Sequence, residues 1–377
     1  MTRIRRVLAS CSALAVAILF ISPVAPAGAA DPASVAASAN AVAWLKTQQQ
    51  PDGSFEVAQF PGFETRDAAL AVAEQAQTGT TWDTGEALAA VEALQAGGNG
   101  PTPLDYLEGL VAASTDPGVA AKTVVLVSEP LGIDPTAFGS VNLVDKMGGC
   151  AATSAPTFNG LLYLTIAQQL VCAGAPAANV TTIRNAQQAN GGWGFTGDDT
   201  GTDLDNDTTA VALEALIGSG ATAADPAVRS ALAFFAANFQ ADGAWQSFGA
   251  DDPNSTALAV LGLTAAGYDV TTSCWRDTFA PNLVGTPYTS PDAWLRSQQL
   301  TTGADAGRVQ SPSDSFGVNT FATAQFVEGL LRSWLPVARA AAQTCSTVGP
   351  PPLVIVSPAE SSTVEAAVVN VQPRFTG

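Results

Sequence analysis

One helix-starting pattern recurs along the chain and limits the folds that are open to it. Segments 83–88, 207–213 and 254–260 each place an Asp or Asn before a run rich in Ala, Leu and Thr, and segment 319–324 follows the same frame more loosely. Asp and Asn accept hydrogen bonds from the free amides of a first helical turn, and Ala and Leu have high helix propensity. Each segment therefore predicts a helix, and its nearly all-apolar sequence predicts a buried one.

A second, more amphipathic set of helices precedes most of the buried ones. These outer helices are expected at residues 42–50, 182–189, 228–240 and 292–299. Weaker copies of the buried helix raise its count to six. The predicted buried helices are 83–97, 118–132, 158–173, 207–218, 254–266 and 319–331. Six outer and six buried helices satisfy every buried face by closing into a ring, and we expect all the buried helices to begin at one end of it.

Three outer helices end in a shared pattern of Gln, Gly and an aromatic residue. The copies are Gln49, Gly53 and Phe55; Gln187, Gly191 and Trp193; and Gln240, Gly243 and Trp245. With the preceding Trp44-Leu45, Thr182-Ile183 and Phe234-Phe235, they resemble the glutamine-tryptophan repeats of the squalene cyclase and protein prenyltransferase superfamily. The resemblance implies an all-α fold, the α6/α6 toroid, over residues 33–346, with a central cavity suited to a bulky, mostly apolar ligand.

The same resemblance gives the repeat aromatics a structural role. In the superfamily they tie an outer helix to the following loop, so Phe55, Trp193 and Trp245 are expected to be buried braces. The alternative is that Trp193 or Phe195 also faces the mouth of the cavity. Secreted cobalamin carriers use a toroid of similar topology as a binding module, and the chain is similar to them in size, cysteine content and expected export.

Both ends of the chain differ in composition from the helical region. Arg3, Arg5 and Arg6 precede an apolar run and then Ala27-Gly28-Ala29, which predicts a cleaved signal peptide over residues 1–30 and a secreted protein, extracellular or associated with the cell wall. After cleavage no segment is expected to cross a membrane. Residues 347–377 begin with a Pro-rich linker and continue with β-branched residues, which predicts a short, β-prone and incomplete C-terminal tail.

Composition excludes several classes of function. The 377 residues contain no His and carry a formal charge of -18. Without His, neither a Ser-His-Asp triad nor the zinc site of the protein prenyltransferases can form. Such acidity disfavours nucleic acid as a partner, because phosphate backbones are bound by clustered Lys and Arg. We expect a monomer whose partner is an apolar or amphipathic small molecule.

The cysteines fit an oxidising compartment. Once the signal peptide is removed, four remain, and an even number in an exported chain predicts two disulfides. Three pairings are possible. The favoured one joins Cys150 to Cys172 and Cys274 to Cys345, because the first pair closes a short loop around one helical segment.

The acid-rich segment 198–210 carries the most informative chemistry, and three interpretations compete for it. Asp205, Asp207 and Thr208 resemble the Asp-x-Asp-Asp-Thr-Ala motif of class II terpenoid cyclases, which implies an isomerase with Asp207 as the protonating acid and Asp205 beside it. However, Thr208 replaces the third Asp. Alternatively, Asp203, Asp205, Asp207 and Glu214 occupy positions 1, 3, 5 and 12 of a calcium loop, as in a calcium-stabilised cell-surface module.

In the third interpretation Asp207 caps its helix, as Asp83, Asn254 and Asn319 do in their own repeats. Capping is compatible with ligand contact, because a helix N-terminus offers free amides and the positive end of a dipole. We therefore expect Asp207 to be an ionised cap at the ligand site. The other residues predicted to contact the ligand are Trp82, Asp83, Trp193, Phe195, Asn254 and Asn319. The favoured function is binding of an isoprenoid-like or corrinoid-like ligand, and cyclisation is the alternative.

Overall fold

The structure is a computed structural model that describes residues 30–56, 62–201, 205–312, 314 and 319–344. This part of the chain is mostly helical, as predicted, and its only strands are the two residues each of β1 (Gln246–Ser247) and β2 (Ala250–Asp251), an antiparallel hairpin. The predicted tail at 347–377 lies outside the described residues, as does all but the last residue of the predicted signal peptide. No described helix has the length and apolarity needed to cross a bilayer.

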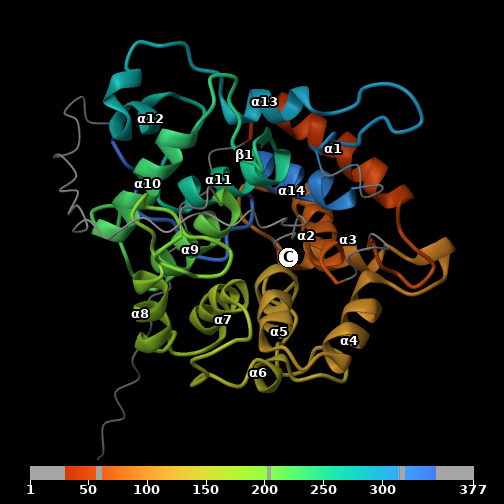
Figure 1. The fold of residues 1–377 in the computed structure, drawn as a ribbon. Coiled ribbons are helices and arrows are strands. Elements are labelled where there is room, and N and C mark those ends of the chain that lie inside the picture. The colour runs from red at the N-terminus through yellow and green to blue at the C-terminus, as the bar shows by residue number, and fades with distance from the viewer. Residues whose placement is uncertain (1–29, 57–61, 202–204, 313, 315–318, 345–377) are drawn as a thin grey trace, which may run out of the picture.

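Six helices form an inner ring in the described structure, and the others surround it (Figure 1). Each inner helix contacts the next, and the last closes on the first, so the ring predicted from the recurrence is confirmed. The ring order is α2 (Glu64–Ala76), α5 (Pro117–Thr123) with its π-helical extension η2 (Val124–Ser128), α7 (Phe158–Val171), α9 (Asn206–Gly218), α11 (Pro253–Ala265) and α14 (Thr320–Leu331).

The outer helices pack between neighbouring inner helices. For example, α8 contacts both α7 and α9, and α13 contacts both α11 and α14. The helices outside the ring are α1 (Pro32–Thr47), α3 (Thr84–Glu92), α4 (Pro103–Ala113), α6 (Leu143–Lys146), α8 (Ala177–Asn185), α10 (Pro226–Asn238), α12 (Cys274–Phe279) and α13 (Pro291–Ser297), with 3-10 turns η1 (Ala96–Gly98) and η3 (Pro281–Leu283).

The first inner helix is α2, and the prediction of 83–97 for this place is wrong. Helix α3, which covers the predicted segment, buries only Ala87 and Val91, whereas eleven residues of α2 are buried. Sequence reasoning missed α2 because its first turn carries charged residues, among them Glu64 and Asp67, so it lacks the apolar appearance of the other inner helices.

A repeated hydrogen bond identifies α2 as a true copy of the repeat. In four repeats a backbone amide of the loop before the inner helix donates to a Thr hydroxyl in that helix, at 2.9–3.1 Å. The amides belong to Phe55, Trp193, Trp245 and Val309, and the acceptors, which we call the ladder threonines, are Thr65, Thr209, Thr256 and Thr323. These equivalent threonines give a common register for four of the inner helices.

The glutamines and aromatics of the repeats brace the outer helices, as expected. The Gln187 side chain donates to the Gly191 carbonyl and to the Ala227 carbonyl at the start of α10, both at 2.8 Å. Trp193 and Trp245 are fully buried, and each indole donates to a carbonyl ten residues earlier. Gln240 does not belong at the Gln187 position. Its backbone bonds match those of Gln188, so the third copy has Phe239 in place of the repeat Gln.

The segment after α14, residues 333–344, covers one end of the ring. Near its start the Trp334 amide donates to Glu74 of α2 (2.9 Å), and the Trp334 indole donates to the Val125 carbonyl of η2 (3.3 Å). Further along, Ala340 donates to Ala265, at the end of α11. These contacts are made with the C-terminal ends of inner helices, so we call residues 333–344 the closing segment.

The predicted bond between Cys150 and Cys172 is confirmed, with Cα atoms 5.8 Å apart. It joins the end of α7 to the loop before that helix, which was the reason for favouring this pairing. Cys274 is also disulfide-bonded, while Cys345, its predicted partner, lies outside the described residues. The pairing of Cys274 with Cys345 therefore stays a prediction.

Candidate functional site

The ladder threonines show which side chains point into the ring. Positions two and five residues after each Thr are one turn apart on the same helix face. At the first position lie Asp67, Val211, Leu258 and Gln325, and at the second lie Leu70, Glu214, Leu261 and Glu328. Asp67 forms an ion pair with Lys122 of α5, and the charges of Asp67, Glu214 and Glu328 act on Tyr163 of α7, which places this face on the inside of the ring.

A buried ion pair lies in this interior. Lys122 of α5 lies 3.2 Å from the Asp67 carboxylate of α2, and both side chains are at most 5% exposed. The Lys122 ammonium lies 5.4 Å from the centre of the Tyr163 ring and 5.5 Å from that of Phe321, within the range of cation–π attraction. Phe321 belongs to α14, which α2 separates from α5 in the ring, so Lys122 reaches across the interior.

Amide groups extend this polar arrangement around the ring. Gln325 donates to the second oxygen of Asp67 at 3.1 Å, and the amide groups of Gln325 and Asn254 lie 3.1 Å apart. Asp67, Gln325 and Asn254 come from α2, α14 and α11, three consecutive members of the ring. The Asp67 carboxylate is thus paired with the Lys122 ammonium and hydrogen-bonded by the Gln325 amide.

Two further acids lie one turn deeper in the interior. Glu214 of α9 and Glu328 of α14 are 7% and 3% exposed. Burial raises the pKa of Glu214 to about 8. Burial, reinforced by the charges of Asp67 and Glu74, also raises the pKa of Glu328 well above its ordinary value. Burial therefore favours the neutral carboxylic acid at both positions, and among the described residues neither carboxyl is paired with a cation.

Four apolar side chains of the interior keep a small solvent-accessible surface. Leu258 and Leu261 are 9% and 8% exposed and Tyr163 and Phe321 are 8%, whereas Val260 and Leu263 on the same helix as the two leucines are fully buried. These four residues are therefore the apolar side chains that a ligand inside the ring would contact.

The other end of the ring carries the predicted acidic segment. Asp205, not Asp207, is the N-cap of α9, and it accepts from the Thr208 amide and the Thr208 hydroxyl, both at 2.8 Å. Asp207 lies two residues further on and is half-buried. The same shift holds for α11, where Asp252 is the cap instead of Asn254. Asp83 and Asn319 cap α3 and α14 as predicted.

Asp207 lies close enough to the α11 cap to affect its ionisation. Burial, followed by the charge of Asp207, raises the pKa of Asp252 to about 7. Asp314 adds a smaller contribution of the same sign. The end of the ring opposite the closing segment therefore gathers acids from α9, α11 and the loop before α14, and we call it the mouth.

We expect Asp205→Ala to destabilise the chain by about 1 kcal/mol, the usual cost of losing an N-cap. The reason is that the Thr208 amide and hydroxyl lose their acceptor. Thermal unfolding of Asp205→Ala beside Asp199→Ala, which removes an exposed acid from the same loop, measures this effect. Equal melting temperatures for the two variants would disprove the cap assignment.

The residues predicted to contact a ligand do not lie together. Asn254 and Asn319 lie at the mouth, and Phe195 is half-buried in the loop before α9. Trp193 is fully buried in the core as a brace. Trp82 and Asp83 lie at the opposite end, where Trp82 packs on Trp334 of the closing segment with ring centres 5.3 Å apart. The expectation that Asp83 shares an end with Asn254 and Asn319 is therefore wrong, because α3 is an outer helix.

The calcium-loop arrangement does not fit the positions of its described members. Helix α9 already begins at Asn206, so Glu214 lies ~13 Å along the helix from Asp205. One ion binds its ligands at only ~2.4 Å, so it cannot reach both. Asp203 lies outside the described residues. Within the described ranges, no group of three acidic or Cys side chains is arranged to hold a metal ion.

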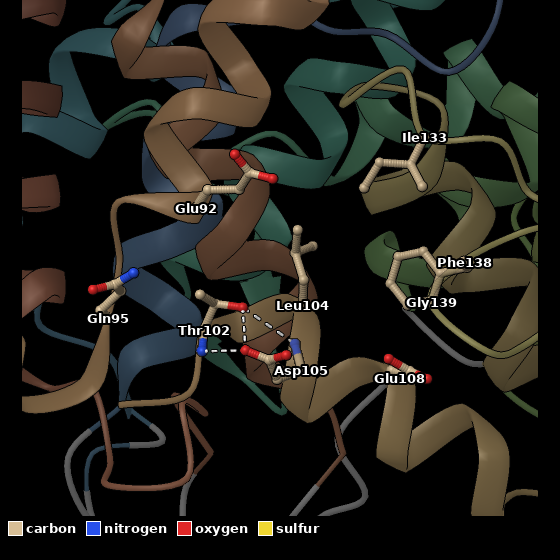
Figure 2. A pocket seen from close by; sticks show the side chains of 9 residues that line it. All are labelled: Glu92, Gln95, Thr102, Leu104, Asp105, Glu108, Ile133, Phe138 and Gly139. Carbon is tan, nitrogen blue, oxygen red and sulfur yellow. Dashed lines mark hydrogen bonds between the residues drawn. The ribbon is translucent and has the colours of Figure 1, made fainter. Parts of the chain in front are cut away.

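A pocket of ≈ 470 Å³ lies outside the ring interior, between α3, α4 and the loop that follows η2 (Figure 2). Glu92, Asp105 and Glu108 give it an acidic lining. Asp105 forms the capping box of α4 with Thr102, as drawn in Figure 2, and Glu108 accepts a hydrogen bond from the Ser140 amide. Two of the three acids are thus structural, so the ring interior is the stronger candidate site.

Comparisons with known proteins agree with this architecture. No protein-family model and no curated protein matches the sequence. Among solved structures, the ligand-free type II terpene cyclase MstE from Scytonema is similar, with 13% identity, a TM-score of 0.54, and coverage of 80% of this chain and 98% of that chain. Its fold is an α/α toroid.

Two variants of the same cyclase match equally well. One is a complex with merosterolic acid A as product, with 14% identity, a TM-score of 0.54, and coverage of 80% of this chain and 97% of that chain. The other is a complex with geranylgeranyl dihydroxybenzoate as substrate, with 14% identity, a TM-score of 0.53 and the same coverage. At such low identity the similarity shows the fold alone, which is the toroid predicted from the repeats.

Proposed function

We propose that this chain is a secreted binding module that takes an apolar, isoprenoid-like ligand into the interior of its ring. The observation that carries the proposal is the residual exposure of interior aliphatic and aromatic side chains, Leu258, Leu261, Tyr163 and Phe321, inside a ring that the closing segment covers at one end. Burying each ~40 Å² of ligand surface there contributes on the order of 1 kcal/mol.

The mouth is the side from which a ligand enters. It lies beside the β1–β2 hairpin, because the Asn206 side chain donates to the Gln246 carbonyl at 2.8 Å. The hairpin carries Phe248, which is 80% exposed. An exposed aromatic ring at the entrance gives an apolar ligand a first contact. The cyclase with the same fold, which was solved with a geranylgeranyl substrate, supports this class of ligand.

Native mass spectrometry of the protein purified from its own host tests the proposal, together with titration of farnesol. We expect a co-purifying small molecule or saturable binding of farnesol. Leu261→Trp fills the interior and should abolish farnesol binding, whereas Val284→Trp, at a 63% exposed surface site, should leave it unchanged. Equal binding by both variants would place the ligand elsewhere and refute the proposal.

A second candidate function is acid-initiated cyclisation with Asp207 as the protonating acid. The specific observation in its favour is the pair of acids at the mouth, where the charge of Asp207 helps to raise the pKa of Asp252 to about 7. Two carboxyls that interact in this way hold a proton more readily than either does alone. Incubation with squalene or a shorter polyprene should then give a cyclic product, and Asp207→Asn should lose that activity. Unchanged substrate would dismiss this candidate.

A further inference from the structure

The ring interior contains more carboxyl groups than cations. Lys122 is paired with Asp67 at 3.2 Å, and Arg332, at the closed end, binds both oxygens of Asp292 at 2.8–3.1 Å. Another buried cation, Arg66 of α2, donates to the Thr123 hydroxyl at 2.9 Å and to the Gly62 carbonyl at 2.7 Å. In the described part of the chain, Oε1 of Glu328 is buried without a hydrogen-bond partner. The Glu214 carboxyl forms no hydrogen bond or ion pair there, and burial is the cause of its raised pKa. Both side chains are more than nine-tenths buried. Buried carboxyl groups usually have a partner, and these lack one.

The two acids share the same space. Glu214 occupies the position of α9 that Glu328 occupies on α14, five residues after a ladder threonine, so both point inward at the same depth. Their charges interact with each other, and both interact with Tyr163 of α7. The equivalent residue of α11, the helix between them in the ring, is Leu261. A ligand group beside Leu261 therefore lies between the two carboxyls.

The interior already contains one buried alkylammonium group, which shows what surroundings this ring provides for one. The Lys122 ammonium is compensated by one carboxylate and flanked by two aromatic rings, Tyr163 and Phe321. Glu214 and Glu328 offer carboxylates for a second such group but have no cation of their own. The acidic mouth would draw cations toward the interior.

We propose that the ligand of the ring interior is an apolar amine, whose ammonium group binds between the carboxyls of Glu214 and Glu328 while its hydrocarbon chain packs on the interior leucines and aromatic rings. The inference rests on the proposed binding function and specifies the ligand class. An ammonium has three hydrogen-bond donors for two carboxyls, whereas an alcohol offers one and a carboxylate would be repelled by Asp67.

Binding has a defined proton balance. Without a ligand, burial favours the neutral acid form of Glu214 and Glu328, and the amine in solution is an ammonium. Forming the ion pair turns one carboxylic acid into a carboxylate, so one proton is released to solvent. The other charged or titratable groups around the pair are Asp67, Glu74 and Arg66 of α2, Lys122 of α5 and Tyr163 of α7. Helix α11 contributes only leucines at the two inward positions.

Three ligands with one hydrocarbon chain test the inference by calorimetry: farnesylamine, farnesol and farnesoic acid. We expect farnesylamine to bind the whole protein at pH 7 at least tenfold more tightly than farnesol in 0.3 M salt, which screens surface binding, and farnesoic acid to bind most weakly. Buffers of different ionisation enthalpy should report close to one proton released per farnesylamine and none per farnesol.

Single substitutions distinguish binding inside the ring from binding on the surface. Glu214→Gln should weaken farnesylamine at least tenfold and leave farnesol unchanged, and Glu328→Gln provides a second version if the first variant unfolds. The matched control is Glu92→Gln, an exposed acid of α3, which should change neither. Equal affinity of the wild-type chain for the amine and the alcohol would overturn the amine inference but leave the proposed function standing. Failure of all three ligands to bind would overturn both.

Discussion

Glu56→Ala is expected to destabilise the chain by on the order of 3–5 kcal/mol. The Glu56 carboxyl is buried and caps α2 from outside the helix. It accepts from the amides of Gly62 and Phe63 at 2.6 and 2.8 Å and from the Thr65 hydroxyl at 2.7 Å. Removing it leaves several buried donors without an acceptor in the helix that closes the ring between α14 and η2. Chemical denaturation of wild type and variant measures the loss.

Glu108→Ala provides the control for this prediction. Glu108 also accepts two hydrogen bonds, from the Ser140 amide and hydroxyl, but these bonds are exposed to solvent. Its removal should cost less than about 1 kcal/mol, because water replaces the lost acceptor. If the two variants unfold at the same denaturant concentration, capping of α2 by Glu56 does not hold the ring together.

Glu214→Gln is expected to flatten the pH dependence of stability. The pKa of Glu214 is raised to about 8, so between its ordinary value of 4.5 and 8 the folded chain binds a proton that the unfolded chain releases. The stability contributed by this group is complete below about pH 4.5 and is lost as the pH rises to 8, with a total of up to ~5 kcal/mol. Asp252, with a pKa of about 7, acts in the same direction.

The measurement is the free energy of unfolding of both proteins from pH 5 to pH 8.5. The wild type should lose stability across this range, and Glu214→Gln should lose clearly less. Glu92→Gln, in which the replaced acid is exposed, should follow the wild-type curve. A variant curve parallel to the wild type would mean that Glu214 is not a neutral acid in the folded ring.

The ring could be predicted from the sequence because the same helix-starting pattern recurs along the chain. Apolar helices can bury their faces only against each other, and four predicted helices with shared starting residues plus two weaker copies gave a ring of six. Five of the six were placed correctly from that pattern. Helix α2 was missed because its first turn carries charged residues, of which Asp67 forms an ion pair inside the ring. Thr65, ten residues after Phe55, was the available signal, since Thr256 follows Trp245 by eleven.

The candidate site was harder to predict, because side-chain direction depends on register. Asp207 and Asn254 were expected to be N-caps, but each is the second residue of its helix. The N-caps are Asp205 and Asp252, two residues earlier. The sequence analysis used Glu214 only as position 12 of a calcium loop. Its position inside the ring becomes clear when the ladder threonines align it with Glu328. The closing segment follows no periodic pattern, so only the fold shows that it covers the ring.

Photoaffinity labelling with a diazirine analogue of farnesol tests the central claim, that the ring interior is the ligand site, most directly. Peptide mapping should place the label on interior residues of α7, α9, α11 and α14, such as Tyr163, Leu258 and Phe321, and unlabelled farnesol should compete. Label confined to the surface, for example to the pocket between α3 and α4 that is lined by Leu104 and Phe138, would contradict the account.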